Sequence, residues 1–167
     1  MSEEKNGGAE QPKPPAQPQM KILAQYIRDM SFENFVVRGA MTGEMKPQVE
    51  VTVGLDSRKR GDDGHFEVLQ KYKVSAKAQG SDEMMFLLEI EYGGIFQIAG
   101  VPDEQLHPYT LIECPRMLFP YVRRIVGDIT RDGGFPAVSM ESIDFVALYR
   151  SEMQRRAQAE AANKKPA

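Results

Sequence analysis

The 167-residue sequence has little cysteine and little excess charge. Cys114 is its single cysteine, and the formal net charge at neutral pH is −3. One cysteine excludes an intramolecular disulfide and a zinc site made of several cysteines, and it fits a reducing compartment. The slight acidic excess argues against duplex nucleic acid as the main partner, because phosphate binding needs a concentrated basic surface. Acidic patches suit a basic protein partner instead.

Long apolar runs are also missing. The apolar stretches have the length of strands and are interrupted by charge, whereas a membrane-spanning helix needs about 20 apolar residues. Residues 1–19 are polar and rich in proline, and they lack the apolar segment that follows the basic start of a signal peptide. We therefore expect a soluble, cytoplasmic protein that does not insert directly into a membrane.

The motifs of common enzyme and cofactor sites are absent as well. There is no Gly-Lys-Ser/Thr phosphate loop, and residues 61–64 (Gly-Asp-Asp-Gly) lack the ligand pattern of a calcium loop. A nucleophile site made of Cys114, His107 and Glu113 is conceivable, but a cysteine beside a proline at a helix start more often packs in a core. The sequence predicts no enzyme activity, no cofactor and no metal. A small-ligand-binding or enzymatic α+β domain that uses Cys114 and His107 is an alternative.

What the sequence does contain is a strand pattern that continues across a double glycine. Large apolar side chains keep one parity before and after Gly93-Gly94, namely Phe86, Leu88, Ile90, Tyr92, Phe96 and Ile98. A tight hairpin at the glycines would turn the last two toward the side that carries Glu89 and Glu91. One long, bent strand over about residues 82–99 keeps all six on one face, with a bulge or a close backbone approach at the glycines.

Three further strands are predicted before it. Apolar residues run through 32–38, and apolar and polar residues alternate over 49–55 and 66–77. Short, glycine-containing turns at 61–64 and 80–83 join neighbouring strands, which predicts antiparallel pairing. The result is a four-stranded antiparallel sheet with one covered face and one wet face.

The second half of the chain shows helical spacing. Apolar residues recur at this spacing from Leu118 to Ile129. Because proline lacks the backbone donor that a helix interior needs, the helix is predicted to start at Pro120 or to be broken there. Gly133-Gly134 is predicted to end it.

A final helix is predicted after residue 144, capped by Asp144 or Ser142. Strands followed by helices predict an α+β fold with two main helices packed on one face of the sheet. The predicted domain covers residues 20–154. It lies between a disordered tail at 1–19 and a frayed or disordered tail at 155–167.

Several residues allow two interpretations. The parity of the long strand turns Leu87 and Glu89 away from the predicted core, so they belong either to an ordinary solvated face or to a partner surface. Asp29 and Glu33 are either strand-edge charges or part of such a surface. Aromatic residues near the prolines either fill the core or line a groove: Phe119, Tyr121 and Phe135. The residues alone leave these alternatives open.

Four motifs together resemble one known family. In the family's order, they are D-M-S-F-E at 29–33, F-L-L-E-I-E-Y-G-G-I-F-Q-I-A-G at 86–100, C-P-R-M-L-F-P-Y-V-R at 114–123 and G-F-P at 134–136. On these motifs, the chain from Tyr26 to about Met153 resembles SecB, the bacterial protein-export chaperone family.

The resemblance implies an ATP-independent molecular chaperone, or holdase. Such a protein keeps precursor proteins unfolded and export-competent and delivers them to the SecA motor of the Sec translocase, which agrees with the missing nucleotide loop. The resemblance also implies a homotetramer, a dimer of dimers in which edge strands pair and long helices pack between the dimers. A SecB-like chaperone dedicated to a toxin–antitoxin pair is the alternative within the same resemblance.

The resemblance also implies which residues act. Positions that contact SecA in the family correspond here to Asp29, Glu33, Leu87 and Glu89. Their carboxylates would suit the basic, zinc-bearing C-terminal tail of SecA, and the zinc belongs to that partner. Client contacts are implied for aromatic residues at the proline-rich junctions, Phe119, Tyr121 and Phe135.

Overall fold

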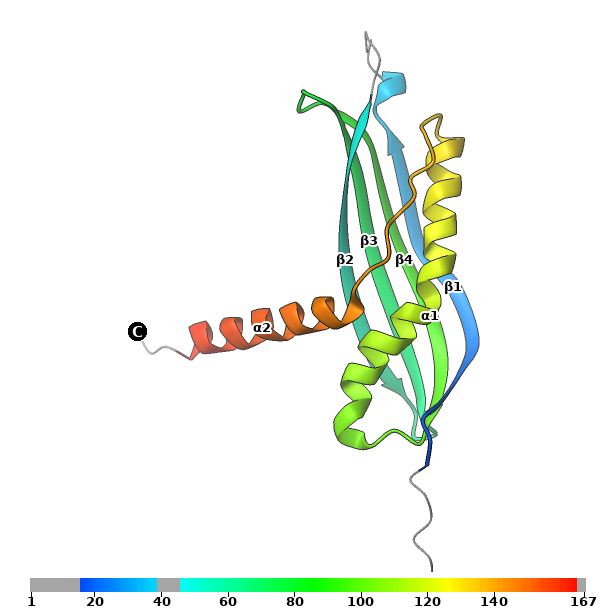
Figure 1. Cartoon of the computed structure of the whole chain (residues 1–167), viewed down its shortest axis with the longest axis vertical. Coiled ribbons are helices and arrows are strands. Elements are labelled where there is room, and N and C mark those ends of the chain that lie inside the picture. The colour runs from blue at the N-terminus through cyan, green and yellow to red at the C-terminus, as the bar shows by residue number, and fades with distance from the viewer. Residues whose placement is uncertain (1–15, 39–45, 165–167) are drawn as a thin grey trace, which may run out of the picture.

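The computed structural model describes residues 16–38 and 46–164, which form an α+β domain (Figure 1). In chain order its elements are β1 (Gln19–Asn34), the 3-10 helix η1 (Val36–Arg38), β2 (Pro47–Arg60), β3 (His65–Ala78), β4 (Met84–Ala99), α1 (Asp103–Asp132) and α2 (Phe145–Asn163). The predicted α+β class and the four antiparallel strands are confirmed. Residues 1–15 of the predicted N-terminal tail and residues 165–167 lie outside the described residues.

The sheet has the strand order β1-β4-β3-β2, and every neighbouring pair is antiparallel. The two hairpins turn where the sequence predicts them. Gly61 and Gly64 adopt positive φ in the first turn, and Gly80 does so in the second. Glycine is suited to this backbone conformation because it has no Cβ. The chain reaches β2 from β1 by crossing to the opposite edge, so β1 and β2 are the two edge strands.

The double glycine lies inside one continuous strand, as predicted. Gly93 is opposite Tyr26 of β1, and a Cβ at this position would come within 2.8 Å of the Tyr26 ring. On the opposite face, a Cβ at Gly94 would come within 3.0 Å of a Leu118 methyl group. The pair is therefore the point at which an aromatic ring covers one face of β4 and α1 covers the other at close range.

The first strand is longer than predicted and lies earlier in the chain. It runs from Gln19 to Asn34, whereas the segment 36–38 at the end of the predicted strand is a 3-10 turn. Register shifts between Ile22 and Ala24 and between Ile27 and Asp29 break the two-residue period. Because these bulges interrupt the alternation of apolar and polar residues, the pattern alone did not reveal the strand.

The core lies between α1 and the sheet face that α1 crosses, which we call the inner face (Figure 1). It is built from alternate residues of the two central strands and from one side of the helix. Its buried members include Val68, Tyr72, Val74, Phe86, Leu88, Ile90, Phe96, Leu118, Val122 and Val126. We call the opposite sheet face the outer face, and no helix of the described part of the chain packs on it.

The prediction that the first helix starts or breaks at Pro120 is wrong. Helix α1 begins at Asp103 and continues for 30 residues through Pro108, Pro115 and Pro120, with a bend visible in Figure 1. Each proline removes one backbone donor from the helix. Burial of one helix side against the sheet offsets this loss, and the Gln70 side chain on β3 donates a hydrogen bond of 2.8 Å to the Pro115 carbonyl.

The prediction that both helices pack on the sheet is also wrong, because only α1 does so. Helix α2 projects from the body (Figure 1), and Phe145 is its single buried residue. Asp144, one of the two residues predicted to cap this helix, accepts a 3.0 Å hydrogen bond from the Ala147 amide. The helix continues to Asn163, although a frayed tail was predicted from residue 155. Among the described residues, no helix is long and apolar enough to cross a membrane.

Candidate functional site

The outer face brings together the four residues implicated in partner docking. In the antiparallel register of β1 and β4, Asp29 is opposite Glu91, and Glu33 is opposite Leu87. Glu89 follows on the same face of β4, opposite Ser31. Residues paired across strands share a face, so these side chains form one surface on the side of the sheet away from α1. The alternation of residues along β4 predicted which of its side chains share a face, but only the strand pairing places Asp29 and Glu33 beside them.

This surface is mixed in charge, which the sequence analysis did not anticipate. Lys71 of β3 forms an ion pair of 3.0 Å with Glu91, and Lys73 lies 3.9 Å from Glu89. Arg28, at the second bulge of β1, lies 3.7 Å from Glu91. We call the combined set the outer charge cluster, with the members Arg28, Asp29, Glu33, Lys71, Lys73, Glu89 and Glu91.

The middle of the outer charge cluster is hollowed. A shallow depression of about 300 Å³ is lined by Asp29, Lys71, Lys73, Glu89 and Glu91, together with Thr52 and Gly54 of β2. Thr52 and Gly54 pair with Lys73 and Lys71 in the sheet. Because these two residues are small or lack a side chain, they leave the lysines accessible from the β2 side.

A buried carboxylate adjoins the cluster on the same face. Glu67 of β3 accepts hydrogen bonds from the Tyr26 hydroxyl and from the Arg58 guanidinium. These bonds hold the pKa of the Glu67 carboxyl below its ordinary value, despite the burial that opposes ionisation. The network ties β1, β3 and β2 together beside Gly93, so the four residues predicted to dock a partner lie on a firmly connected part of the sheet.

The structure does not bring the three predicted client residues onto one exposed surface. Phe119 is buried, with ring centroids 6.4 Å from Tyr72 and 6.1 Å from Phe145. Phe135 is buried 4.9 Å from the ring of Phe86. Tyr121 lies on the outward side of α1 and is 42% exposed.

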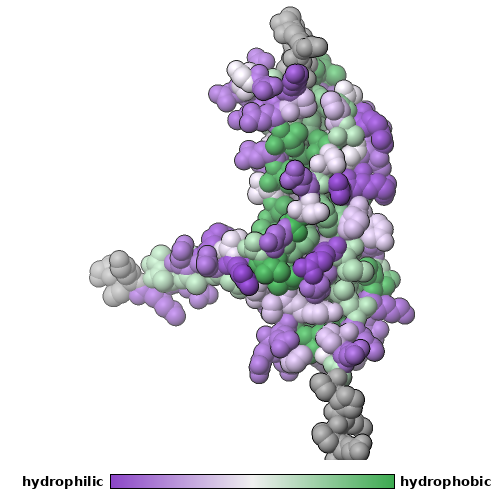
Figure 2. Space-filling model, viewed as in Figure 1, coloured by the Kyte–Doolittle hydropathy of each residue, from purple (hydrophilic) through white to green (hydrophobic). Residues whose placement is uncertain are grey.

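An apolar groove that the sequence analysis missed lies along β2. It measures about 590 Å³ and is bounded by Pro47, Val49, Val51 and Val53 on one side and by the extended segment 136–143 on the other. Val49 and Val51 are 38% and 39% exposed. Figure 2 shows apolar surface extending down the face that carries this segment. The alternating valines were visible in the sequence, but the segment that turns them into one wall of a groove was not.

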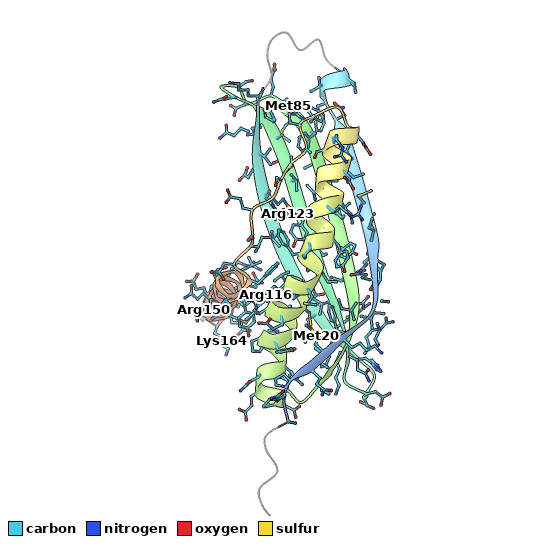
Figure 3. The ribbon with its side chains drawn as sticks, turned by 45° about the vertical axis from the view of Figure 1, so that its right-hand side comes forward. Met20, Met85, Arg116, Arg123, Arg150 and Lys164 are labelled. Carbon is cyan, nitrogen blue, oxygen red and sulfur yellow. The ribbon has the colours of Figure 1, made fainter. Side chains whose placement is uncertain are left out.

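The residues of the alternative nucleophile site do not act together. The Cys114 thiol is buried 3.4 Å from the sulfur of Met20, which lies beside the lower part of α1 (Figure 3). Burial raises the pKa of this thiol to about 12. His107 Nδ1 instead lies 3.1 Å from the Tyr149 hydroxyl on α2. Within residues 16–38 and 46–164, no group of three or more His, Cys, Asp or Glu side chains is placed to hold a metal ion.

Sequence comparison assigns the chain to the family that its motifs resemble. The family described as preprotein translocase subunit SecB matches residues 13–156. The protein-export protein SecB of Ruegeria pomeroyi is 51% identical over 165 residues, which cover 99% of this chain and 98% of that protein. The protein of the same name from Cereibacter sphaeroides is 55% identical over 145 residues, which cover 86% and 87% of the two chains.

Structural comparison supports the fold. The Mycobacterium tuberculosis Rv1957 SecB-like chaperone, solved in complex with a ChAD peptide from the Rv1956 HigA1 antitoxin, superposes with a TM-score of 0.61. The match covers 74% of this chain and 90% of that one, at 15% sequence identity. At this identity the likeness shows a shared arrangement of strands and helices.

Proposed function

The chain belongs to the SecB family of protein-export chaperones, and on that basis we propose that it is an ATP-independent holdase for precursor proteins. SecB is a chaperone family and not an enzyme family. The cytoplasm is the compartment in which such a protein meets its clients before export. In this proposal the protein keeps clients unfolded and delivers them to SecA.

The observation that carries the proposal is the presence of two dissimilar surfaces on opposite sides of one sheet. The inner side offers the apolar groove between β2 and segment 136–143, and the outer side offers the outer charge cluster. An apolar groove suits an unfolded polypeptide, whereas exposed carboxylates suit a basic partner. A holdase that transfers clients needs both kinds of contact at the same time.

Client binding uses the free edge of β2 together with the groove. Because β2 is an edge strand, its outward-facing backbone groups have no neighbouring strand within residues 16–38 and 46–164. An extended client segment pairs with these groups while alternate apolar side chains enter the groove beside Val49 and Val51. Main-chain pairing is independent of the client sequence, which explains a broad choice of clients. Binding lowers the concentration of free chain that is able to aggregate.

The aromatic residues have different roles in this proposal. Tyr121 is available to a client on the surface as it stands. Phe119 and Phe135 become available only if α2 or the segment after Gly133 moves, because Phe145 packs on the first ring and the core holds the second. Their contribution to client binding therefore includes a conformational step.

The proposed assembly is a homotetramer, a dimer of dimers. On the edge strand β1, Leu23, Ile27 and Met30 are exposed large apolar residues, and on α1 Met117 is exposed as well. Pairing of β1 edges and packing of α1 between dimers would cover these side chains, and it would remove an edge that is prone to aggregation. Light scattering at micromolar concentration distinguishes a tetramer from a monomer of 18.8 kDa.

Delivery to SecA is proposed for Asp29, Glu33, Leu87 and Glu89. The carboxylates attract a basic segment of SecA, and Leu87 offers an apolar contact among them. The curated relatives at 51% and 55% identity carry protein-export names. Service to a toxin–antitoxin pair is the less favoured function, because the matching structure with an antitoxin peptide shares only 15% identity.

The test separates the two surfaces by mutation. Val51→Lys places a charge in the groove and is expected to abolish suppression of aggregation of a denatured precursor, measured by light scattering without ATP. Glu89→Lys is expected to leave this protection intact and to reduce SecA affinity in calorimetry. Glu160→Lys on the exposed part of α2 makes the same charge change away from both surfaces and serves as the control. Protection that appears only with ATP, or equal effects of Glu89→Lys and Glu160→Lys on SecA affinity, would contradict the proposal.

A further inference from the structure

The lysines of the outer charge cluster lie in ordered rows with its carboxylates. One row across the sheet contains Glu89, Lys73 and Thr52, and the adjacent row contains Asp29, Glu91 and Lys71. Directly opposed side chains of opposite charge attract each other across antiparallel strands. The strand register therefore places each lysine directly opposite a carboxylate, on the same face of the sheet.

These ion pairs are open to exchange. The side chains of Lys73 and Glu89 are 58% and 54% exposed, and the atoms of the pair are 3.9 Å apart. Lys71 is equally open at 57%, although its 3.0 Å pair with Glu91 is closer. Water screens such pairs strongly, so an incoming basic side chain is able to displace a lysine from its carboxylate.

The lysines also reduce the charge of the surface substantially. The outer charge cluster has four carboxylates and three cations, so its net charge is only −1. Within the described residues, neither Asp29 nor Glu33 has an ion-pair partner, and both neutralised carboxylates lie on β4. The attraction felt by a distant cation is thus much weaker than the carboxylates alone would produce.

We propose that Lys71 and Lys73 determine the specificity of the outer face. Because the two lysines pair with Glu91 and Glu89, a segment with closely spaced basic side chains binds by displacing both lysines at once. Polypeptides with scattered positive charges bind less well. Unfolded clients are polypeptides of the second kind. The two lysines therefore keep clients off the face that serves the basic partner. This inference rests on the docking proposed above, and it deepens it.

The expected effect follows from Coulomb attraction. A unit charge about 7 Å away in water changes the affinity for a cation by about threefold, and salt near 0.1 M reduces this to about twofold. Lys73→Ala and Lys71→Ala should each strengthen binding of a short lysine-rich peptide about twofold at this salt concentration, and the double variant about fourfold. The gain should increase as salt is lowered.

The experiment measures peptide binding by calorimetry in the full-length protein. Lys77→Ala is a matched control, because Lys77 lies on the same strand but is close to Asp82, at 3.7 Å, outside the cluster. Lys73→Arg retains the charge and should leave the affinity unchanged. A second peptide with the same number of lysines separated by neutral residues tests specificity. The double variant should bind the two peptides more equally than the wild type does.

The outcomes are distinct. Unchanged affinity in both alanine variants overturns the inference, and weaker binding overturns it by showing that the lysines contact the ligand directly. Repeating the titrations with SecA tests the underlying proposal separately. If SecA does not bind the wild type while the peptide gains affinity in the variants, the proposed delivery to SecA fails and the role of the lysines stands.

Discussion

The clearest test of how the sheet holds α1 is the replacement of Gln70 by leucine. The Gln70 side chain is fully buried and donates through Nε2 to the Pro115 carbonyl at 2.8 Å. Its Oε1 accepts a hydrogen bond from the Tyr72 hydroxyl, which is itself buried. Two buried polar groups, the Pro115 carbonyl and the Tyr72 hydroxyl, thus depend on the Gln70 side chain at the middle proline of the helix.

The expected cost follows from the groups that the change leaves unpaired. Leucine has a similar size but removes the acceptor of the Tyr72 hydroxyl, which costs about 1–3 kcal/mol for a buried group. Loss of the bond to the Pro115 carbonyl adds about 1 kcal/mol. We therefore expect Gln70→Leu to lower the free energy of unfolding by about 2–4 kcal/mol, a large part of the 5–15 kcal/mol typical of a domain.

Urea denaturation followed by circular dichroism measures this effect, at one fixed protein concentration because assembly adds to stability. Tyr72→Phe removes the other partner, and the double variant leaves no unpaired hydroxyl or amide oxygen between the two residues. The double variant should therefore cost at least about 1 kcal/mol less than the sum of the single changes. Additive costs, or a loss of less than about 0.5 kcal/mol in Gln70→Leu, would refute the reasoning.

Two further results are expected from the buried ionisable groups. The Tyr26 and Arg58 hydrogen bonds depress the pKa of Glu67, so its stabilisation is present above about pH 4.5 and is lost as the pH falls through the lower pKa of the folded state. Glu67→Gln should lower the free energy of unfolding at neutral pH, and it should reduce the loss of this free energy on acidification, measured by urea denaturation at several pH values. An unchanged dependence on pH would contradict the role of Glu67. The Cys114 thiol, with its pKa raised to about 12, should react with a thiol reagent at pH 8 far more slowly in the native protein than in urea. Equal rates would show that the lower part of α1 does not cover it.

Some of the candidate site was predictable from local pattern, and some was not. The two-residue period placed Leu87 and Glu89 on the face opposite the core, and the structure agrees. The same period in β3 places Lys71 and Lys73 together, but their positions beside Glu91 and Glu89 depend on register. That register is a property of two strands and not of either one alone.

The groove and the client residues show the same division. The alternating valines of β2 suggested a half-buried strand, but the facing wall, segment 136–143, is held on α1 by hydrogen bonds from the Val138 amide to Thr130 and from Arg123 to Ser139. The aromatic residues were ambiguous in the sequence because a core ring and a groove ring have the same composition. Packing around Phe119 and Phe135 decided that both are buried in this chain.

The sequence by itself determined the features that neighbouring residues control. The alternation of β4 across Gly93-Gly94, the two glycine turns and a helix cap at Asp144 or Ser142 all depend on residues a few positions apart, and the structure then selects Asp144 as the cap. The family was likewise recognisable from the sequence, because each family motif is a contiguous run of residues.

Only the tertiary structure decided the extent of α1, the position of β1 and the direction of α2. Local propensity places a helix boundary at Pro120, yet burial at helical spacing from Leu111 to Val126, together with the Gln70 bond, stabilises the helix across its prolines. The strand β1 is formed by pairing with β4, from which it is 52 (Asn34 to Phe86) to 80 (Gln19 to Ala99) residues away in sequence, and its bulges interrupt the two-residue period. These outcomes depend on surfaces that meet only after folding, when burial and pairing outweigh the preferences of short segments.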